Sequence, residues 1–226
     1  MSKAIVNFEK ANRPFLSEEH LMFRDSLRKF IEREIEPNFE KWEEDRLIPR
    51  ELWNKLGVQG FLCPSVEEEH GGLGVDFGFD VILSEEFSKV GAGLSGIGLH
   101  SNVVTPYISS FGTEEQKAKF LPKFVSGEWI SAIAMTEPVA GSDLQKIETT
   151  AIKDGSDYIV NGQKTFISNG ILSDVVIIAC KTDPKAVPAH NGISLLIIER
   201  GMEGFSRGRK LHKVGMHSQD TAELIF

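Results

Sequence analysis

The stretch Ala134–Asp143, AMTEPVAGSD, stands where the sequence changes from one pattern to another. It leaves an apolar run, turns at Pro138 and ends in a small hook that begins with Gly141 and Ser142. Before Gly127 the apolar residues recur at helical spacing, and after it they fall into short segments separated by turn signals. The residues on the two sides of this stretch therefore predict two different kinds of structure.

The first half of the chain carries helical spacing and capping residues. Ser17 is a candidate N-cap, and the apolar residues after it recur at helical spacing until Pro37. Thr113, with Gln116 three residues later, forms a capping box. Five such helices form a bundle. We expect them at residues 17–37, at 49–57, at 79–90, within 94–111, where Pro106 is a candidate interruption, and at 113–127.

The second half alternates turn dipeptides with short segments rich in β-branched and aromatic residues. The segments are YIVNG, KTFIS, DVVIIAC and GISLLIIE, and the turns are Asp154-Gly155, Asn161-Gly162, Asn169-Gly170 and Asn191-Gly192. A parallel α/β sheet would need long helical crossovers, for which this half has no room. We therefore expect an α+β multidomain chain: an all-α bundle at residues 1–128, then an antiparallel β-barrel or β-sandwich at residues 129–226.

The sequence stops at AELIF, within an alternating strand pattern and without a closing turn. Natural chains seldom end so abruptly in apolar residues, because termini usually lie exposed at the surface. We therefore expect that the sequence is a fragment or that a further C-terminal region was left out.

Composition excludes several classes of function. The chain has 226 residues, 41% of them hydrophobic, and a net charge of -8, which argues against nucleic acid as the main partner. It has neither an apolar run long enough for a membrane span nor a signal core at its start, so an intracellular protein is expected. The two cysteines, Cys63 and Cys180, are far apart, so we expect buried free thiols.

The sequence gives little support to three common motifs: a dinucleotide fingerprint, a metal site and a nucleophilic serine. Gly91–Gly96 matches G-x-G-x-x-G, but it follows the helical segment SEEFSKV and no strand, so a glycine-rich helix junction is the better interpretation. The six histidines show no metal-ligand spacing. No G-x-S-x-G elbow is present, so Ser142 is not a convincing nucleophile.

The hook itself has two interpretations. Small residues at Gly141 and Ser142 let backbone N–H groups approach an anion, and Thr136 can offer a hydroxyl and an N–H to the edge of a heteroaromatic ring. In the alternative, Pro138 marks a plain turn that closes the first strand, and Ser142-Asp143 caps the next segment. Turn chemistry leaves both open.

Several segments in their order resemble the acyl-CoA dehydrogenase family, flavoenzymes that insert an α,β double bond into fatty acyl thioesters. They are LSEEHLMFRDSLRKFIEREIEP, EEEHGGLG, FGTEEQKAKFLPKFVSGEWISAIAMTEP, DGSDYIVNGQKTFISNG and KLHKVGMHSQDTAELIF. The segments FISNGILSDVVIIAC, PAHNGISLLIIERG and GRKLHKVGMHSQDTAEL resemble the long-chain member most closely. Two positions depart from the family: Lys146 stands where a small residue is usual, and Asn191 is an extra residue in the PAHNG loop.

This resemblance implies FAD as the cofactor and a fatty acyl-CoA as the substrate. Thr136 would meet the pyrimidine edge of the flavin, Phe166 would pack on the ring system where many relatives carry tryptophan, and Ser168 would donate toward N5. The implied FAD residues are Ile133, Ala134, Met135, Thr136, Gly141, Ser142, Phe166, Ile167 and Ser168. The implied substrate residues are Ser142, Ala189, His190 and, more weakly, Thr182. Without the resemblance, Phe166 would be read as a core aromatic and His190 as a solvated loop residue.

The resemblance also implies a glutamate base in a C-terminal helical domain beyond Phe226, and no glutamate of this sequence can be assigned that role. We therefore expect that the chain cannot turn over by itself. Electron-transfer flavoprotein is the implied electron acceptor, a homodimer or homotetramer the implied assembly, and a bacterial cytoplasm or the mitochondrial matrix the implied compartment. An acyl-CoA oxidase, a flavin monooxygenase of the same superfamily and a non-enzymatic binding or assembly module remain alternatives.

One local exception to the acidic composition is SRGRKLHK, in which Arg207, Arg209, Lys210 and Lys213 form a basic run. A solvated loop and a site for an anionic partner, such as CoA or a flavin pyrophosphate from a neighbouring subunit, are equally compatible with it.

Overall fold

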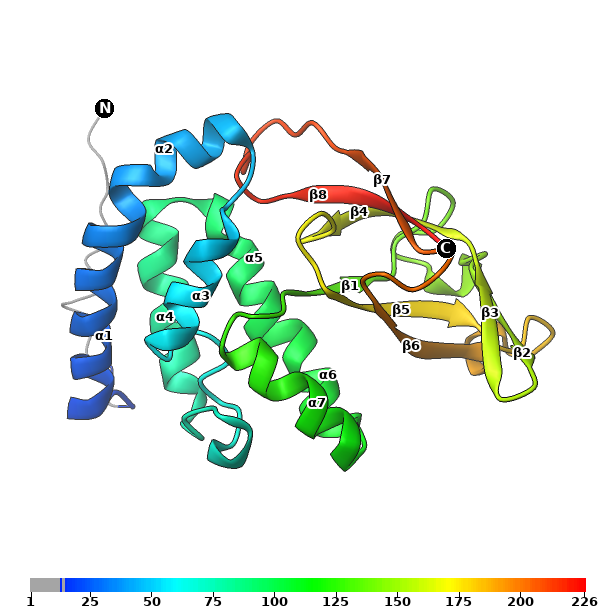
Figure 1. Cartoon of the computed structure of the whole chain (residues 1–226), viewed down its shortest axis with the longest axis horizontal. Helices are drawn as coiled ribbons and strands as arrows, with labels where there is room; N and C mark the ends of the chain where they lie inside the picture. Colours follow the sequence, from blue (N-terminus) through cyan, green and yellow to red (C-terminus); the bar gives the residue numbers. More distant parts are fainter. Residues whose placement is uncertain (1–12, 14) are drawn as a thin grey trace.

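The computed structural model describes residue 13 and residues 15–226, and it places a helical half beside a β half (Figure 1). The helices are α1 Glu18–Phe30, α2 Glu36–Asp45, α3 Arg50–Val58, α4 Phe77–Val90, α5 Ser95–Gly98, α6 Thr105–Phe111 and α7 Glu114–Val125. The strands are β1 Ser131–Ala134, β2 Thr150–Asp154, β3 Asp157–Asn161, β4 Gln163–Ser168, β5 Val175–Lys181, β6 Ile193–Glu199, β7 Ser206–Lys210 and β8 Thr221–Ile225. The expected order of helices followed by strands is confirmed.

Both predicted N-caps are confirmed. The Ser17 hydroxyl accepts from the backbone N–H of His20 at the start of α1. At the start of α7, Thr113 and Gln116 exchange both hydrogen bonds of a capping box. Each cap satisfies backbone donors that the first turn leaves unpaired, so these helices begin where the sequence places them.

Neither Pro37 nor Pro106 ends its helix, which corrects the expectation for Pro37. A π-helical segment, Ile31–Ile35, joins α1 to α2, and Pro37 then lies in the first turn of α2. Likewise, the π-helical segment Leu99–Val104 joins α5 to α6 ahead of Pro106. The wider π turn re-routes the backbone hydrogen bonds just before each proline, so the chain remains helical despite the missing N–H.

The β half consists of two sheets that are not closed into a barrel. In the larger, β5 lies between β6 on one side and both β1 and β2 on the other, with β3 outside β2. The smaller has the order β4-β8-β7. The expectation of purely antiparallel pairing is wrong for β5, which runs parallel to β1 and β2. The crossover from β1 to β5 passes through β4 of the other sheet, so strands replace the helical crossover that we had thought necessary.

The core is continuous between the two halves. Val175 and Ile177 of β5 belong to the hydrophobic cluster that fills the helical bundle. Val176 and Ile178 point to the opposite face of the sheet, as alternation requires, and fill the space between the two sheets. One strand therefore serves both cores, which fixes the helical half against the β half.

The glycine-rich junction between α4 and α5 is a packing site. A Cβ atom at Gly93 would lie 2.0 Å from the hydroxyl of Ser218, and one at Gly96 would lie 2.2 Å from the side-chain oxygen of Gln219. Glycine is therefore needed where the loop before β8 meets the helices. This agrees with a helix junction and offers nothing to a dinucleotide fingerprint.

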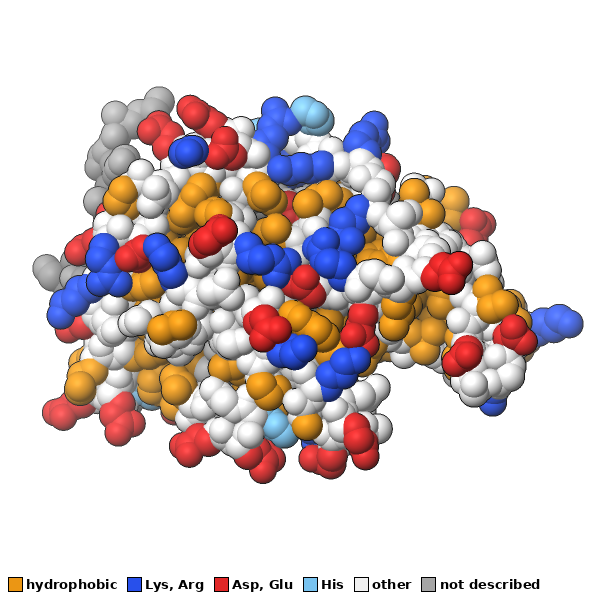
Figure 2. Space-filling model, in the orientation of Figure 1, with side chains coloured by type: hydrophobic (Ala, Val, Ile, Leu, Met, Phe, Trp, Pro, Cys, Tyr) orange, Lys and Arg blue, Asp and Glu red, His pale blue; other side chains and the backbone are white. Residues whose placement is uncertain are grey.

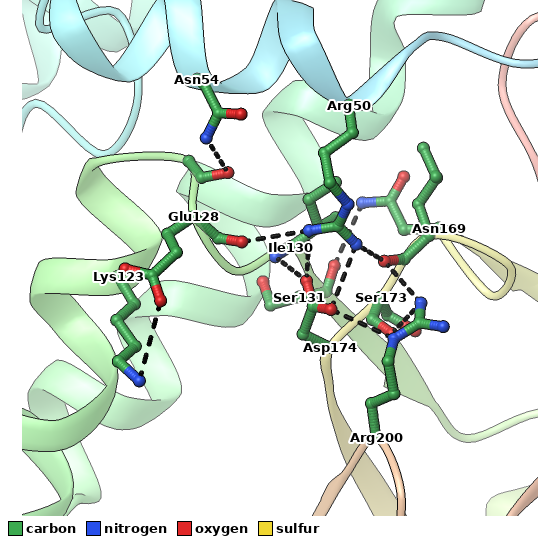
Figure 3. Close-up of polar contacts among 12 residues, drawn as sticks. Arg50, Asn54, Lys123, Glu128, Ile130, Ser131, Asn169, Ser173, Asp174 and Arg200 are labelled. Carbon is green, nitrogen blue, oxygen red and sulfur yellow. Dashed lines mark hydrogen bonds and ion pairs between the residues drawn. The ribbon is translucent and has the colours of Figure 1, made fainter.

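A polar network closes the seam between the halves (Figure 3). Arg50 of α3 binds both carboxylate oxygens of Asp174 at 2.7 and 3.1 Å and donates to the carbonyl of Leu172 at 2.6 Å. Arg200 reaches the same carboxylate at 3.1 Å, and Asp174 also accepts the backbone N–H of Ile130 at 2.9 Å. The carboxylate thus joins α3, the segment leading into β1 and the loop between β4 and β5.

Figure 2 shows Lys and Arg side chains grouped in the middle of one face, over the junction of the two halves. Members of the basic run are engaged within the chain: Arg207 donates to the carbonyls of Gly170 at 2.9 Å and Ser173 at 2.6 Å, and Lys213 donates to the carbonyl of Gln219. Residues 206–210 form strand β7, so the expectation of a loop is wrong for most of the run, and Arg207 and Lys213 are bound to other segments of the β half. In residues 13 and 15–226, no helix combines the length and the apolar character needed to cross a membrane.

Candidate functional site

A tight turn, closed by its own backbone, leads from β1 to the hook. Glu137 and Ala140 exchange two backbone hydrogen bonds, of 2.9 and 3.1 Å, with Pro138 at the corner. Gly141 and Ser142 follow this turn and are exposed, and a Cβ at Gly141 would meet nothing within 4 Å. The hook therefore presents its small residues outward, with open space in front of Gly141.

The buried carboxylate of Glu137 joins the two ends of the loop between β1 and β2. Glu137 is 4% exposed and accepts the backbone N–H groups of Glu148 at 2.6 Å and Thr149 at 3.1 Å. It also accepts the ammonium of Lys164 at 2.7 Å. Burial opposes ionisation of Glu137, but these hydrogen bonds outweigh burial and lower the pKa of the carboxyl below its ordinary value. Glu137 is thus a structural anion.

The β4 strand carries a bulge that exposes Phe166. The pairing of β4 with β8 shifts between Lys164 and Ile167. Phe166 lies within that shift with a φ of 58° and a side chain that is 68% exposed. A bulky residue at positive φ is strained, and an aromatic ring this exposed has little packing to compensate. Such strained, exposed side chains are typical of binding sites.

A cleft of about 430 Å³ lies beside the hook, on the face of the larger sheet that points away from the smaller sheet, and it is large enough for a small ligand. Met135, Ser142 and His190 are among its lining residues, so three predicted site residues are brought together. The rest of the lining is Asp143, Leu144, Gln145, Ala179, Ile193 and Leu195. The floor is mainly apolar, and the polar groups stand at the hook and at the His190 turn.

The other residues predicted to bind FAD or substrate differ in how far they are exposed and in whether they are already bonded. Ala134 and Ile167 are 0% and 3% exposed and lie between the two sheets, so their side chains are directed away from the cleft. Thr182 is occupied by hydrogen bonds to Ser194 at 2.6 Å and to the carbonyl of Gly192 at 3.3 Å, and it does not line the cleft. The remaining ones, Ile133, Thr136, Ser168 and Ala189, are partly exposed.

Three hydroxyl groups in this region find no partner among residues 13 and 15–226. In the part of the chain that the structure describes, the hydroxyls of Thr136, Ser142 and Ser168 have no hydrogen-bond partner, whereas the Thr136 carbonyl accepts from Thr165 at 2.9 Å. Hydroxyls can both donate and accept, so they suit the polar edge of a ligand. The backbone of Thr136 is thus fixed to β4 while its side chain remains free to bind.

Two buried polar residues that the sequence analysis did not identify, His100 and Asn169, hold the start of β1 in place. His100 accepts the backbone N–H of Ser131 at 3.1 Å and donates to the carbonyl of Phe124 at 3.0 Å, and burial lowers its pKa to about 4. Asn169 donates to the carbonyls of Gly96 at 3.0 Å and Ser131 at 3.1 Å. The Asn169-Gly170 turn signal could have drawn attention to Asn169, but no local pattern marks His100 as buried.

The fold and the site together define a class of protein. It has a helical bundle fused to a β domain of two sheets, with a cleft at the hook that Ser142 and His190 line, and an exposed aromatic ring, Phe166, on the β4 bulge. Comparison with known proteins gives the family. The model for the acyl-CoA dehydrogenase N-terminal domain matches residues 17–128, and the model for the acyl-CoA dehydrogenase middle domain matches residues 132–226. The chain belongs to the acyl-CoA dehydrogenase family.

Individual relatives agree. The mitochondrial long-chain specific acyl-CoA dehydrogenase of Sus scrofa is 50% identical over 95% of this chain and 50% of its own length. The crystal structure of an acyl-CoA dehydrogenase from Geobacillus kaustophilus is 62% identical with a TM-score of 0.93, over 94% of this chain and 56% of that one. A glutaryl-CoA dehydrogenase from Mycobacterium smegmatis, solved in complex with FADH2, is 29% identical with a TM-score of 0.85, over 93% and 53%. The chain spans about half the length of the curated relatives that it matches.

Proposed function

We propose that this protein acts in the FAD-dependent α,β-dehydrogenation of fatty acyl-CoA. The observation that carries the proposal is the cleft in which Met135, at the end of β1, and Ser142 of the hook meet His190. The exposed ring of Phe166 on the β4 bulge is the second observation. One side of this arrangement suits a flat ring system, and the other suits a polar chain with a thioester. Family membership supports the same chemistry.

The residues present fit FAD. The exposed Phe166 ring offers an aromatic surface for a flavin, and the unpaired hydroxyls of Thr136 and Ser168 can bind its polar edge. We propose that the flavin site consists of Ile133, the backbone of Ala134, Met135, Thr136, Gly141, Ser142, Phe166, the backbone of Ile167, and Ser168. When bound, the flavin supplies the hydride acceptor for the β-hydrogen of the substrate.

The chain's own residues have binding and orienting roles. Thr136 and Ser168 orient the ring through hydrogen bonds, and Phe166 covers it and excludes water. Ser142 and His190 lie on the same cleft, so we assign them to the thioester and CoA portion, together with Ala189 on the His190 turn. Thr182 is the weakest of the substrate residues because its hydroxyl is already bonded to Ser194.

A long acyl chain is the substrate class that we favour. A second cavity of about 350 Å³ lies between α4 and α5, and its lining is mainly apolar or small. Gly91, Ala92, Ser95 and Gly98 leave room where larger side chains would fill it. We propose that this cavity receives the end of the acyl chain, where each buried methylene would gain about 0.8 kcal/mol and longer chains would therefore be favoured. The 50% identity to a long-chain enzyme supports this choice.

We infer that residues 1–226 supply the ligand platform and not the catalytic base. Proton abstraction needs a carboxylate that can reach the substrate and accept a proton. Glu137, the glutamate nearest in sequence to the hook, is buried and bound to Lys164 and two backbone N–H groups. Asp143, the carboxylate that lines the cleft, is paired with Lys146 at 3.4 Å. The 226-residue chain alone is then expected to bind FAD and acyl-CoA without turnover.

Electron-transfer flavoprotein as electron acceptor and a homo-oligomeric assembly are proposed on family grounds, as implied above. For the compartment we propose the mitochondrial matrix or a bacterial cytoplasm, since the relatives come from the mitochondrion of Sus scrofa and from the bacterium Geobacillus kaustophilus.

The visible spectrum tests these proposals. Purified protein mixed with FAD should retain the yellow flavin spectrum after gel filtration, and anaerobic addition of a long-chain acyl-CoA should shift that spectrum without bleaching it. Bleaching would overturn the inference about the base, since it would require a proton acceptor within residues 1–226. A protein that retains no FAD would overturn the flavoenzyme proposal in favour of a binding or assembly module. Rapid reoxidation by oxygen, after chemical reduction, would favour an oxidase.

A further inference from the structure

Lys164 is the most deeply buried charged side chain near the hook. It lies on β4, its side chain is 0% exposed, and its ammonium is 2.7 Å from a carboxylate oxygen of Glu137. The same ammonium donates to the carbonyl of Met135 at 3.0 Å. Lys164 therefore binds Met135 and Glu137, the residues on either side of Thr136.

The neighbour of Lys164 completes this arrangement. Thr165 donates its backbone N–H to the carbonyl of Thr136 at 2.9 Å. Two successive residues of β4 thus hold three successive residues, 135–137, and leave the hydroxyl of Thr136 unpaired in the described part of the chain. The contacts through Glu137 extend to Glu148 and Thr149 and so fix both ends of the hook loop.

Stability alone does not account for a buried ion pair here. Removing a lysine and a glutamate from water is costly, and burial lowers the pKa of Lys164 while Glu137 opposes that shift. Replacing a buried pair by uncharged side chains of similar volume is often neutral or stabilising in proteins. What uncharged side chains cannot supply is a single fixed geometry among Met135, Glu137 and β4.

We propose that Lys164 is a positioning residue, which with Glu137 sets Thr136 and the Gly141-Ser142 hook in the geometry that binds the flavin. This inference rests on the proposed function for its ligand and on the hydrogen bonds above for its mechanism. Lys164 touches no ligand itself and acts through Met135, Thr136 and Glu137.

The test separates positioning from stability. Lys164→Met alone leaves the Glu137 charge buried without its partner and is expected to unfold easily. The double variant Lys164→Met/Glu137→Gln removes both charges while an amide oxygen remains for the N–H groups of Glu148 and Thr149. We expect its melting temperature to return close to that of the unmodified protein. We expect its FAD dissociation constant to rise about tenfold, as occurs when supporting hydrogen-bond partners are removed from metal sites.

The matched control is Arg33→Met, which removes an exposed pair with Glu34 in the helical half and should leave FAD binding unchanged. Hydrogen exchange supplies a readout that needs no flavin. In the double variant the amides of residues 136–142 should exchange faster, while those of α1 and α4 should be unchanged. A double variant with normal melting, normal exchange and normal FAD affinity would overturn the proposal. If the unmodified protein fails to bind FAD, the proposed function fails, and the exchange result still decides whether Lys164 sets the hook.

Discussion

At the scale of single residues, the bulge on β4 decides the character of the site. In a regular strand Lys164 and Phe166 would share a face, opposite Thr165 and Ile167. The extra residue breaks this alternation, so Lys164 and Ile167 are both buried while Phe166 is exposed. The same local distortion therefore buries the Lys164 ammonium against Glu137 and exposes the ring of Phe166.

Phe166→Gly should separate strain from binding. Glycine adopts positive φ without the cost of about 1–2 kcal/mol that a side chain incurs there, and the exposed ring contributes little packing. We expect an equal or higher free energy of unfolding in urea, with FAD bound roughly five- to tenfold more weakly because an aromatic contact is lost. Phe77→Ala, which removes a ring that is 70% exposed on α4, is the control and should leave FAD binding unchanged. Equal FAD affinity in Phe166→Gly would count against Phe166 as a wall of the site.

At the scale of secondary-structure elements, the loop between β4 and β5 is held mainly by side chains. Its carbonyls accept guanidinium donors: Arg207 binds Gly170, and Arg200 and Arg50 both bind Leu172. Arg50 comes from α3, so the helical half takes part in holding the loop that follows the β4 wall (Figure 3). The position of β4 relative to the helices therefore depends on a charged network.

Arg50→Met should loosen this seam. The variant loses hydrogen bonds to Asp174, Leu172 and Glu128 and leaves the Asp174 carboxylate with fewer donors. We expect the free energy of unfolding to fall by about 2 kcal/mol, the usual effect of losing hydrogen bonds to a charged group. Arg209→Met removes an arginine that is 74% exposed and should change stability by less than about 0.5 kcal/mol. Equal effects of the two substitutions in urea titrations would show that the seam contributes no more than an exposed pair.

At the scale of the whole molecule, we expect the two halves to unfold as one cooperative unit because they share a core at β5. Val175 and Ile177 of β5 belong to the helical core, whereas Val176 and Ile178 of the same strand face the space between the two sheets. Unfolding one half would expose part of the core of the other, which disfavours an intermediate with only one half folded.

The two buried cysteines test this coupling. Cys63 lies in the helical half and Cys180 on β5, and both are 0% exposed. Burial raises their pKa values to about 12 and about 11, so both thiols stay protonated and unreactive in the folded protein. In a urea series with a thiol reagent, we expect both to become labelled at the same midpoint, read by peptide mass spectrometry. Labelling of Cys180 at a clearly lower urea concentration would mean that the β half opens first.

Acid should destabilise the protein through His100. Its folded pKa of about 4 lies below the ordinary 6.5, so the unfolded chain binds more protons between these values. The stabilising contribution is complete above pH 6.5 and is lost as the pH falls toward 4. A shift of this size corresponds to about 3 kcal/mol. His100→Gln should be less stable at pH 7 and should lose less stability between pH 6.5 and 4.

Asp80 changes stability with pH in the opposite direction to His100, so the experiment needs a control for it. Burial raises its pKa from 3.8 to about 6, so its folded form holds the proton, and stability falls as the pH rises through that range. Comparing His100→Gln with its parent in an Asp80→Asn background removes this opposing contribution. An unchanged pH dependence of unfolding in that pair would exclude His100 as the source.

Much of the fold could be read from local signals. The caps at Ser17 and Thr113, the glycine turns and the change of period near Gly127 are properties of neighbouring residues, and the structure confirms the elements that they predict. The prediction was weaker at Pro37, because a π turn that compensates for proline has no marker in the sequence. The parallel pairing of β5 was missed for a similar reason, since register is settled between strands distant in sequence.

The candidate site divides in the same way. Resemblance in sequence named Thr136, Ser142, Phe166 and His190, and the structure brings Ser142 and His190 to one cleft. It also turns Ala134 and Ile167 away from that cleft, which alternation along a strand could have indicated. The roles proposed for these residues await the binding experiments described above.

The sequence by itself determined the order of the helical and β halves, most of their helices and strands, and which segment forms the hook, because capping, turn chemistry and hydrophobic period act over a few neighbouring residues. Only the tertiary structure decided that Lys164 is buried against Glu137, that Asp174 joins α3 to the β4–β5 loop, and that one strand serves two cores. Those features arise when a bulge, a parallel pairing and a shared interface bring distant residues together. No local pattern encodes such contacts, since their energy depends on burial and geometry that exist only after the chain has folded.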